Sequence, residues 1–322
     1  MKTISILIPT YNEEENVLPL YDALRGQLAA LGERYDYEIL FIDNKSQDST
    51  RERLLQLCAR DKRVKAIFNT RNFGQGDSPY YGLLHTSGDC AILMGADFQD
   101  PPELIPRMVE AWEEGHKIVC MVKAGNRGKG LARVLRAAYY KTIRALSHID
   151  VMENFGNFGL YDRSFLDVLR RLDDPEPFFS VMVAELGFDR LTIPYTQARR
   201  RAGKTSNNLL TLYDYAMRSI TTYTKAGLRA ASLLGLLVSA ASFVIALAYL
   251  VLKLANWDKY PMGMAPLTIG MFFIGGVQLF FLGLLGEYTI SIQRRAMKRP
   301  LVIEERRVNF EEDDISNIGE PE

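Results

Sequence analysis

Three acidic side chains, Glu13, Asp43 and Asp97, each follow a short apolar run, and Gln99 adds an amide oxygen two positions after Asp97. Carboxylate and carbonyl oxygens are the ligands that hard divalent cations prefer, and such cations also bind phosphate oxygens. The pattern is therefore typical of a site for a divalent cation with a phosphate ligand. Two simpler interpretations stay open: Asp43 could only fix a turn, and Asp100, which precedes two prolines, could only cap a helix.

The elements that would position these residues alternate along the first 200 residues. Apolar runs lie at Ile4–Ile8, Glu38–Ile42, Val64–Phe68, Cys90–Met94 and Ile118–Val122. Helical patterns separate them at Glu14–Leu31, Ser49–Arg60, Ser78–Thr86 and Pro102–Glu114. This alternation predicts βαβ units and an α/β fold with a mostly parallel sheet flanked by helices. Ligands bind beyond the carboxyl ends of such strands, so the acids are expected at one edge of the sheet.

Composition and short motifs exclude several classes of protein. The chain has 39 Lys and Arg against 39 Asp and Glu, and a net charge of zero argues against bulk binding to nucleic acid. Its three cysteines stand far apart in apolar runs, as reduced core residues do. Neither a G-x-G-x-x-G motif after the first strand nor a P-loop motif is present, so neither a dinucleotide nor a P-loop site is expected.

Two long stretches, Ala230–Leu252 and Met262–Gly286, carry no charged residue. Each exceeds the roughly 20 residues that cross a bilayer core, which predicts a two-helix transmembrane hairpin. Lys and Arg flank both stretches on their outer sides, so both chain ends are expected in the cytoplasm and the protein in the inner (plasma) membrane as a multi-pass protein. The apolar spacing in Leu209–Ala226 predicts an amphipathic helix at the membrane surface, with a core helix as the alternative.

Six motifs occur along the chain in an order that resembles one known family. They are PTYNEE (Pro9–Glu14), ADFQDPPE (Ala96–Glu103), GLYDR (Gly159–Arg163), RRAGKTSNN (Arg200–Asn208), LGEY (Leu285–Tyr288) and KRPLVIEE (Lys298–Glu305). The first two resemble family 2 glycosyltransferases with a GT-A fold. The complete set is similar to the polyprenyl-phosphate glycosyltransferases, a group that includes the bactoprenol glucosyltransferases and dolichyl-phosphate mannose synthase.

The resemblance implies roles for ten residues. Those that would bind the nucleotide are Pro9, Tyr11, Glu13 and Asp43. Those that would bind Mg²⁺ or Mn²⁺ and the donor diphosphate are Asp97 and Gln99. Basic residues that would meet the phosphates of donor and acceptor are Lys123 and Arg133, and those of a loop that closes over the site are Arg200 and Lys204. The chain departs from the family at Gly95 and Asn157, where the family has acids.

We therefore expect an inverting glycosyltransferase that moves a hexose from a nucleotide sugar, a UDP-sugar first of all, to undecaprenyl phosphate. The acceptor is already an anion, so no general base is required. One alternative is a hydroxyl acceptor on a lipid-linked glycan, with Asp162 or Glu153 as the base. Another is a non-catalytic subunit that binds nucleotide sugars, which the departures at Gly95 and Asn157 suggest.

The expected division of the chain has four parts: a cytoplasmic catalytic domain at 1–208, an amphipathic juxtamembrane helix at 209–229, two transmembrane helices at 230–290 and a cytoplasmic tail at 291–322. The glycines of the second apolar stretch suit close helix packing in lipid, which suggests a homo-oligomer.

Overall fold

The computed structural model describes residues 1–124, 152–172, 174–175, 177–198, 264–297 and 299–310, together with 233–238, 240–241, 244, 247–248, 251 and 255. The chain forms two compact units. The first contains residues near both ends of the chain, and the second contains the apolar region.

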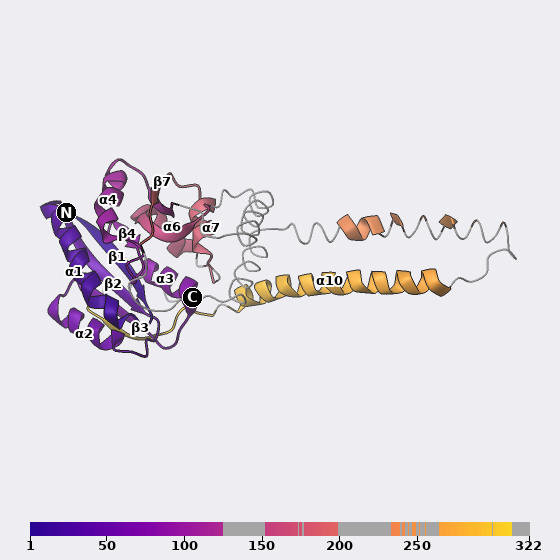
Figure 1. Ribbon diagram of the computed structural model, residues 1–322, viewed down its shortest axis with the longest axis horizontal. Helices are drawn as coiled ribbons and strands as arrows, with labels where there is room; N and C mark the ends of the chain where they lie inside the picture. Colours follow the sequence, from indigo (N-terminus) through magenta and orange to yellow (C-terminus); the bar gives the residue numbers. More distant parts are fainter. Residues whose placement is uncertain are drawn as a thin grey trace. The chain divides into compact units, whose positions relative to one another are not determined.

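An eight-stranded sheet forms the centre of the first unit (Figure 1). Its strands are β1 (Lys2–Thr10), β2 (Tyr35–Asp43), β3 (Val64–Asn69), β4 (Cys90–Leu93), β5 (Ile118–Lys123), β6 (Phe155–Asp162), β7 (Arg190–Tyr195) and β8 (Glu304–Val308). They lie in the order β7-β5-β6-β4-β1-β2-β3-β8. Neighbours are parallel at β1–β2, β1–β4, β2–β3 and β5–β7, and antiparallel where β6 or β8 takes part. The predicted α/β fold with a mostly parallel sheet is confirmed.

Helices cover both faces of this sheet. The helices of the unit are α1 (Glu14–Ala30), α2 (Thr50–Arg60), α3 (Gly74–Leu84), α4 (Ile105–Glu113), α6 (Arg163–Leu172) and α7 (Phe179–Glu185), with short 3-10 turns η1 (Gly32–Arg34) and η2 (Pro102–Leu104). Apolar residues of α1, α2 and α4 pack with Ile6 of β1 in one core cluster. Those of α3, α6 and α7 pack with Leu7 in the other. Successive strand side chains point to opposite faces, so one apolar strand serves both clusters.

All five predicted strands exist, and the predicted helices differ from the observed ones mainly at their ends. The largest difference is α3, which begins at Gly74 and not at Ser78. Pro79, a residue typical of a first helical turn, lies inside this helix. The three cysteines are buried and unpaired, as expected.

Three strands, β6, β7 and β8, were not predicted from the sequence. Strand β6 lies between β4 and β5, and Gly159 makes this close approach possible, because a Cβ there would lie 2.4 Å from the Val119 carbonyl oxygen. Strand β8 pairs with β3 although its residues fall in the predicted C-terminal tail. The tail is therefore not wholly separate from the first unit.

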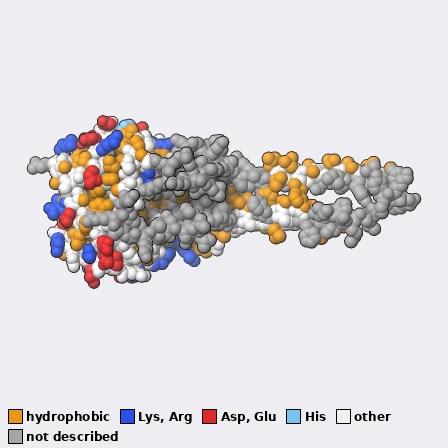
Figure 2. Space-filling view, in the orientation of Figure 1, with side chains coloured by type: hydrophobic (Ala, Val, Ile, Leu, Met, Phe, Trp, Pro, Cys, Tyr) orange, Lys and Arg blue, Asp and Glu red, His pale blue; other side chains and the backbone are white. Residues whose placement is uncertain are grey.

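The second unit contains α10 (Met264–Ala296), which includes most of the second predicted span. Within it, Phe273–Ile290 is long and apolar enough to cross a membrane by length and composition, and among the described residues it is the only such segment. Large side chains such as Leu279 and Phe273 are exposed, and the described atoms of this helix are mostly hydrophobic (Figure 2). Residues 233–238 of the first predicted span are helical, but the hairpin stays a prediction, and the predicted helix at 209–229 lies outside the described residues.

Candidate active site

The acids predicted to share one edge of the sheet follow three adjacent strands. Strand β1 lies between β4 and β2, so Glu13, Asp43 and Asp97 all come from the carboxyl ends of neighbouring strands. Thr10 is in register with Asp43, and the amide of Asn44 donates a hydrogen bond of 2.9 Å to the Thr10 carbonyl oxygen. The topology therefore places the loops after β1, β2 and β4 at this edge.

The loop after β1 is fixed against the loop after β2. The Asn12 amide donates to Ser46 Oγ at 2.9 Å, and Asn12 Oδ1 accepts from the Gln47 amide at 2.8 Å. The Glu13 amide donates to Thr50 Oγ1 at 2.8 Å. Asn12 has a φ of 56°, a left-handed conformation that asparagine tolerates better than most residues. The neighbouring Tyr11 side chain is 41% exposed and is available to a ligand.

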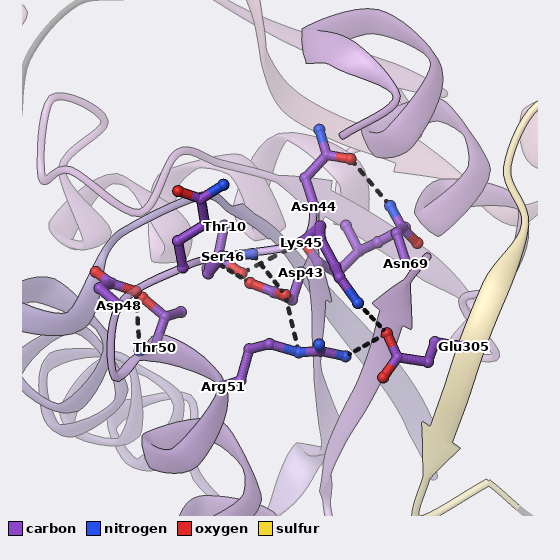
Figure 3. Close-up of polar contacts among 12 residues, drawn as sticks. Thr10, Asp43, Asn44, Lys45, Ser46, Asp48, Thr50, Arg51, Asn69 and Glu305 are labelled. Carbon is purple, nitrogen blue, oxygen red and sulfur yellow. Dashed lines mark hydrogen bonds and ion pairs between the residues drawn. The ribbon is translucent and has the colours of Figure 1, made fainter. Parts of the chain in front are cut away.

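Asp43 fixes the turn that follows β2. Its side chain is fully buried, and it accepts hydrogen bonds from the Ser46 amide at 3.1 Å and from the Ser46 hydroxyl. Arg51 Nε lies 3.5 Å from Asp43 Oδ2 (Figure 3). Burial raises the pKa of Asp43, while the bonds from Ser46 and the charge of Arg51 oppose that rise. The turn-fixing interpretation thus has direct support, and contact with a nucleobase stays a prediction.

A network of asparagines, which the sequence analysis missed, joins the ends of β2 and β3 to the start of α3. Asn44 Oδ1 accepts from Asn69 Nδ2 at 3.1 Å and from the Phe73 amide at 2.8 Å. Asn44 Nδ2 donates to Asn72 Oδ1 at 2.9 Å and to the Gly74 carbonyl oxygen at 3.0 Å. A carboxylate at position 44 could not donate these last two bonds. The only signal in the sequence is that Asn44, Asn69 and Asn72 all follow strands.

The loop after β4 holds two carboxylates near Gly95. Asp97 is 8% exposed, and its Oδ1 accepts from the Gln99 amide at 3.1 Å. Asp100 Oδ2 accepts from the Gly95 amide at 3.0 Å, and Asp100 Oδ1 accepts from the Tyr195 hydroxyl at 2.8 Å. The capping interpretation of Asp100 is wrong, because the N-cap residue of η2 is Pro101 and no side-chain hydrogen bond caps this turn.

The surroundings of Asp100 oppose its ionisation in part. Burial raises the pKa of Asp100, and the nearby charge of Asp97 adds to this rise. The hydrogen bonds from Tyr195 and from the Gly95 amide, together with the charge of Lys123, lower it.

This loop fits a hard divalent cation. A Cβ at Gly95 would lie 3.3 Å from Asp100 Oδ2 and 3.4 Å from Asp97 Oδ1, so two carboxylate oxygens approach one point. A divalent cation would neutralise that concentration of negative charge, and Gln99 adds an amide oxygen. In the described part of the chain, no group of three or more His, Cys, Asp or Glu residues could hold a metal ion. Diphosphate oxygens and water would therefore have to complete the coordination shell.

Side chains at the carboxyl ends of β5 and β7 lie near the loop that follows β4. Lys123 is in register with Tyr195, and Lys123 Nζ lies 3.1 Å from where a Gly156 Cβ would be, so glycine at 156 leaves room for the ammonium group. Gln197 Nε2 donates to Gln99 Oε1 at 3.1 Å. Lys123 is thus brought near Asp100, and its charge lowers the pKa of that carboxyl. Tyr195 and Gln197 were missed, because their connection to residues 99 and 100 exists only through the sheet.

Three predicted basic residues, Arg133, Arg200 and Lys204, lie outside the described residues. Asp162, one of the candidate bases, lies at the wrong edge: it is in register with Cys90 at the amino end of β4, where it accepts from Trp112 Nε1 at 2.7 Å. Asn157 stands nearer the site, with its backbone oxygen accepting from the Tyr161 hydroxyl at 2.7 Å.

Comparison with known proteins shows the family to which the chain belongs. Residues 5–170 match the sequence profile of Glycosyl transferase family 2. Over 308 residues the chain is 33% identical to the uncharacterized glycosyltransferase YkcC of Bacillus subtilis, covering 95% of this chain and 94% of that protein. It is 30% identical over 304 residues to the prophage bactoprenol glucosyl transferase homolog of Escherichia coli, covering 94% and 98%.

Among solved structures, glucosyl-3-phosphoglycerate synthase from Mycobacterium tuberculosis, in complex with Mg²⁺ and uridine diphosphate, aligns at 20% identity with a TM-score of 0.47. The alignment covers 69% of this chain and 78% of that one. The profile match and the two relatives, which span nearly the whole chain, establish that this chain belongs to glycosyl transferase family 2.

Proposed function

We propose that the protein transfers a hexose from a nucleotide sugar, a UDP-sugar first of all, to a polyprenyl phosphate at the cytoplasmic face of the membrane. The observation that carries the proposal is the loop after β4, where Asp97 and Asp100 approach Gly95, Gln99 contacts Gln197, and the charge of Lys123 acts on Asp100. The similar protein from Escherichia coli is named a bactoprenol glucosyl transferase homolog, and this name supports a polyprenyl acceptor.

The residues of this loop suit the departure of a nucleoside diphosphate. Asp97 and Gln99 would hold Mg²⁺ or Mn²⁺, and the ion would supply positive charge to the leaving diphosphate. Lys123 adds the positive charge of its ammonium group. The absence of a side chain at Gly156 leaves room for this group, and pairing with β7 fixes the Lys123 backbone. Arg133, Arg200 and Lys204 remain candidates for further phosphate contacts.

The acceptor chemistry needs no base at position 157. An oxygen of the lipid phosphate attacks the anomeric carbon, and the bond from that carbon to the donor diphosphate breaks, so the configuration inverts. The phosphate oxygen carries a negative charge before the reaction, so no proton has to be removed. Asn157 is compatible with this chemistry, whereas a hydroxyl acceptor would require a base. Of the two candidate bases, Asp162 lies at the opposite edge of the sheet, and Glu153 stays a candidate.

The exposed apolar surface of α10 supports a membrane location. A helix that is hydrophobic on all sides and not buried against protein is typical of a lipid environment. Such a location would bring the catalytic unit to the leaflet that holds the lipid phosphate. Cytoplasmic termini, the second span and homo-oligomerisation belong to the same proposal.

The test is transfer by the purified full-length protein in lipid nanodiscs that contain undecaprenyl phosphate. Radiolabelled UDP-glucose, UDP-galactose, UDP-N-acetylglucosamine and GDP-mannose are each supplied with Mg²⁺ or Mn²⁺, and the label is followed into the organic phase. We expect one donor to give a labelled lipid whose sugar has the β configuration by NMR. Asp97→Ala should abolish the product, whereas Asp36→Ala, an exposed acid at the start of β2, should not.

Two results would overturn the proposal. Nucleotide binding without transfer from any donor would favour a non-catalytic subunit. Transfer that requires a lipid-linked glycan in place of the lipid phosphate would favour the hydroxyl acceptor.

A further inference from the structure

Strand β8 places a carboxylate beside the loop that follows β2. The strand is fixed at both ends: the Thr70 amide donates to the Ile303 carbonyl oxygen at 3.0 Å, and Asn309 Nδ2 donates to the Cys58 and Val64 carbonyl oxygens at 2.7 and 2.8 Å. Pairing with β3 fixes the residues between them. The sheet pairs Arg306 with Phe68 and Glu304 with Asn69, and Glu305 is the extra residue between them where the register shifts. Its backbone is therefore held from both sides.

The Glu305 carboxylate binds two cations of the β2–α2 loop. Its Oε2 lies 2.7 Å from Lys45 Nζ and 3.1 Å from Arg51 Nη2. The Nε of the same Arg51 guanidinium lies 3.5 Å from Asp43 Oδ2 (Figure 3). The ring of Phe68 lies under this guanidinium, 4.9 Å from its central carbon. One arginine thus connects the strand-end acid Asp43 to a residue of the C-terminal segment.

The backbone of this loop has an unusual conformation at Lys45. Lys45 has a φ of 65°, a left-handed conformation that is unfavourable for a residue with a long side chain. The turn from Asp43 to Ser46 is joined to Asn12, and Asn12 is adjacent to the exposed Tyr11. A continuous set of contacts therefore runs from Glu305 through Arg51 and Asp43 to the loop that presents Tyr11.

We infer that Glu305 is a positioning residue for the nucleoside of the donor, acting by holding Lys45 and Arg51 so that the Asp43 turn and the Tyr11 loop keep their arrangement. The inference rests on the proposed function, in which Tyr11 and Asp43 contact the nucleotide. On this inference the segment that follows α10 is a part of the donor site, although Glu305 lies 260 positions after Lys45 in the sequence.

Glu305 could instead act only through its negative charge, and that effect predicts a different result for nucleotide binding. Removing a negative charge would attract a diphosphate more strongly and would leave an uncharged nucleoside unaffected. A positioning role predicts weaker binding of the nucleoside itself. An isolated exposed ion pair contributes little, so a clear loss would mean that Glu305 acts through the network to buried Asp43.

The experiment measures binding of uridine and guanosine, and of UDP and GDP, to the full-length protein by calorimetry. Glu305→Gln is compared with Glu304→Gln, which removes the same charge from the same strand but affects contacts with Arg307 and Tyr81. We expect Glu305→Gln to weaken binding of the preferred nucleoside about tenfold and to raise KM for the donor with little change in kcat. Glu304→Gln should stay within about twofold of the wild type.

A double-variant cycle tests the route through Arg51. Once Arg51→Gln is present, Glu305→Gln should weaken nucleoside binding little further. Wild-type affinity in Glu305→Gln, or an equal loss in Glu304→Gln, would overturn the inference while leaving the proposed function intact. A wild-type protein that binds none of the four probes would instead overturn the proposed function, and the inference with it.

Discussion

Replacement of Gly95 by aspartate tests the charge arrangement of the loop after β4. The backbone permits the change, because φ at Gly95 is outside the left-handed range that excludes side chains. The new Cβ would meet Asp100 Oδ2 at 3.3 Å and Asp97 Oδ1 at 3.4 Å, so neighbouring atoms need to shift by only a few tenths of an ångström. The variant therefore adds a carboxylate at a position that two others already approach.

The magnitude follows from the repulsion between carboxylates. Two unit charges 4 Å apart interact by about 1 kcal/mol in water and by about 4 kcal/mol at an effective dielectric constant of 20. The site is largely buried, so we expect metal-free Gly95→Asp to lose about 1–4 kcal/mol of unfolding free energy. Mn²⁺ should restore this loss, because the third carboxylate becomes a ligand.

The assay is urea unfolding with and without Mn²⁺, together with calorimetry of Mn²⁺ binding with and without UDP. Gly95→Asn is the matched control, since it fills the same space without a charge. We expect the wild type to bind Mn²⁺ poorly alone and well with UDP, a coupling that must be reciprocal. Gly95→Asp should bind Mn²⁺ alone more tightly than the wild type does.

Two results would refute this reasoning. Equal stabilities of metal-free Gly95→Asp and Gly95→Asn would mean that the carboxylates near Gly95 do not repel a third one. Tight Mn²⁺ binding by the unliganded wild type would mean that a ligand beyond Asp97 and Gln99 completes the site.

Two further predictions concern stability and topology. Burial lowers the pKa of His85 from its ordinary value of 6.5 to about 4. Between these two pH values the unfolded chain binds a proton at His85 and the native state does not. The stability that depends on neutral His85 is present above pH 6.5 and is lost as the pH falls toward 4, by about 2 kcal/mol at pH 5. Urea unfolding at pH 7 and pH 5 should show a smaller loss in His85→Gln, and an equal loss would contradict the assignment. A cysteine introduced at Asn256 should react with an impermeant maleimide in intact cells, whereas one at the C-terminus should not; the reverse pattern would place the catalytic unit outside the cytoplasm.

Local sequence pattern was enough to predict the strands that carry the acids. Continuous apolar runs such as Ile4–Ile8 indicate strands covered on both faces, and an acid within a few residues after such a run is expected near the strand end. The predicted placement of Glu13, Asp43 and Asp97 at one edge depends on this local rule and on parallel pairing. The family could likewise be inferred from the sequence, because its motifs occur in order along the chain.

Only the tertiary structure decided which partners these residues have. Asp100 has the local context of a helix cap, but its carboxylate accepts from Tyr195, which lies 95 residues away. Asp162 was a plausible base by sequence, and the antiparallel register of β6 places it at the opposite edge. Strand β8 reads EERRV and has no apolar alternation, so it is a strand only because the edge of β3 is available to pair with it. Local patterns specify elements through side-chain burial, whereas these contacts depend on strand order and register, which bring together residues far apart in the chain.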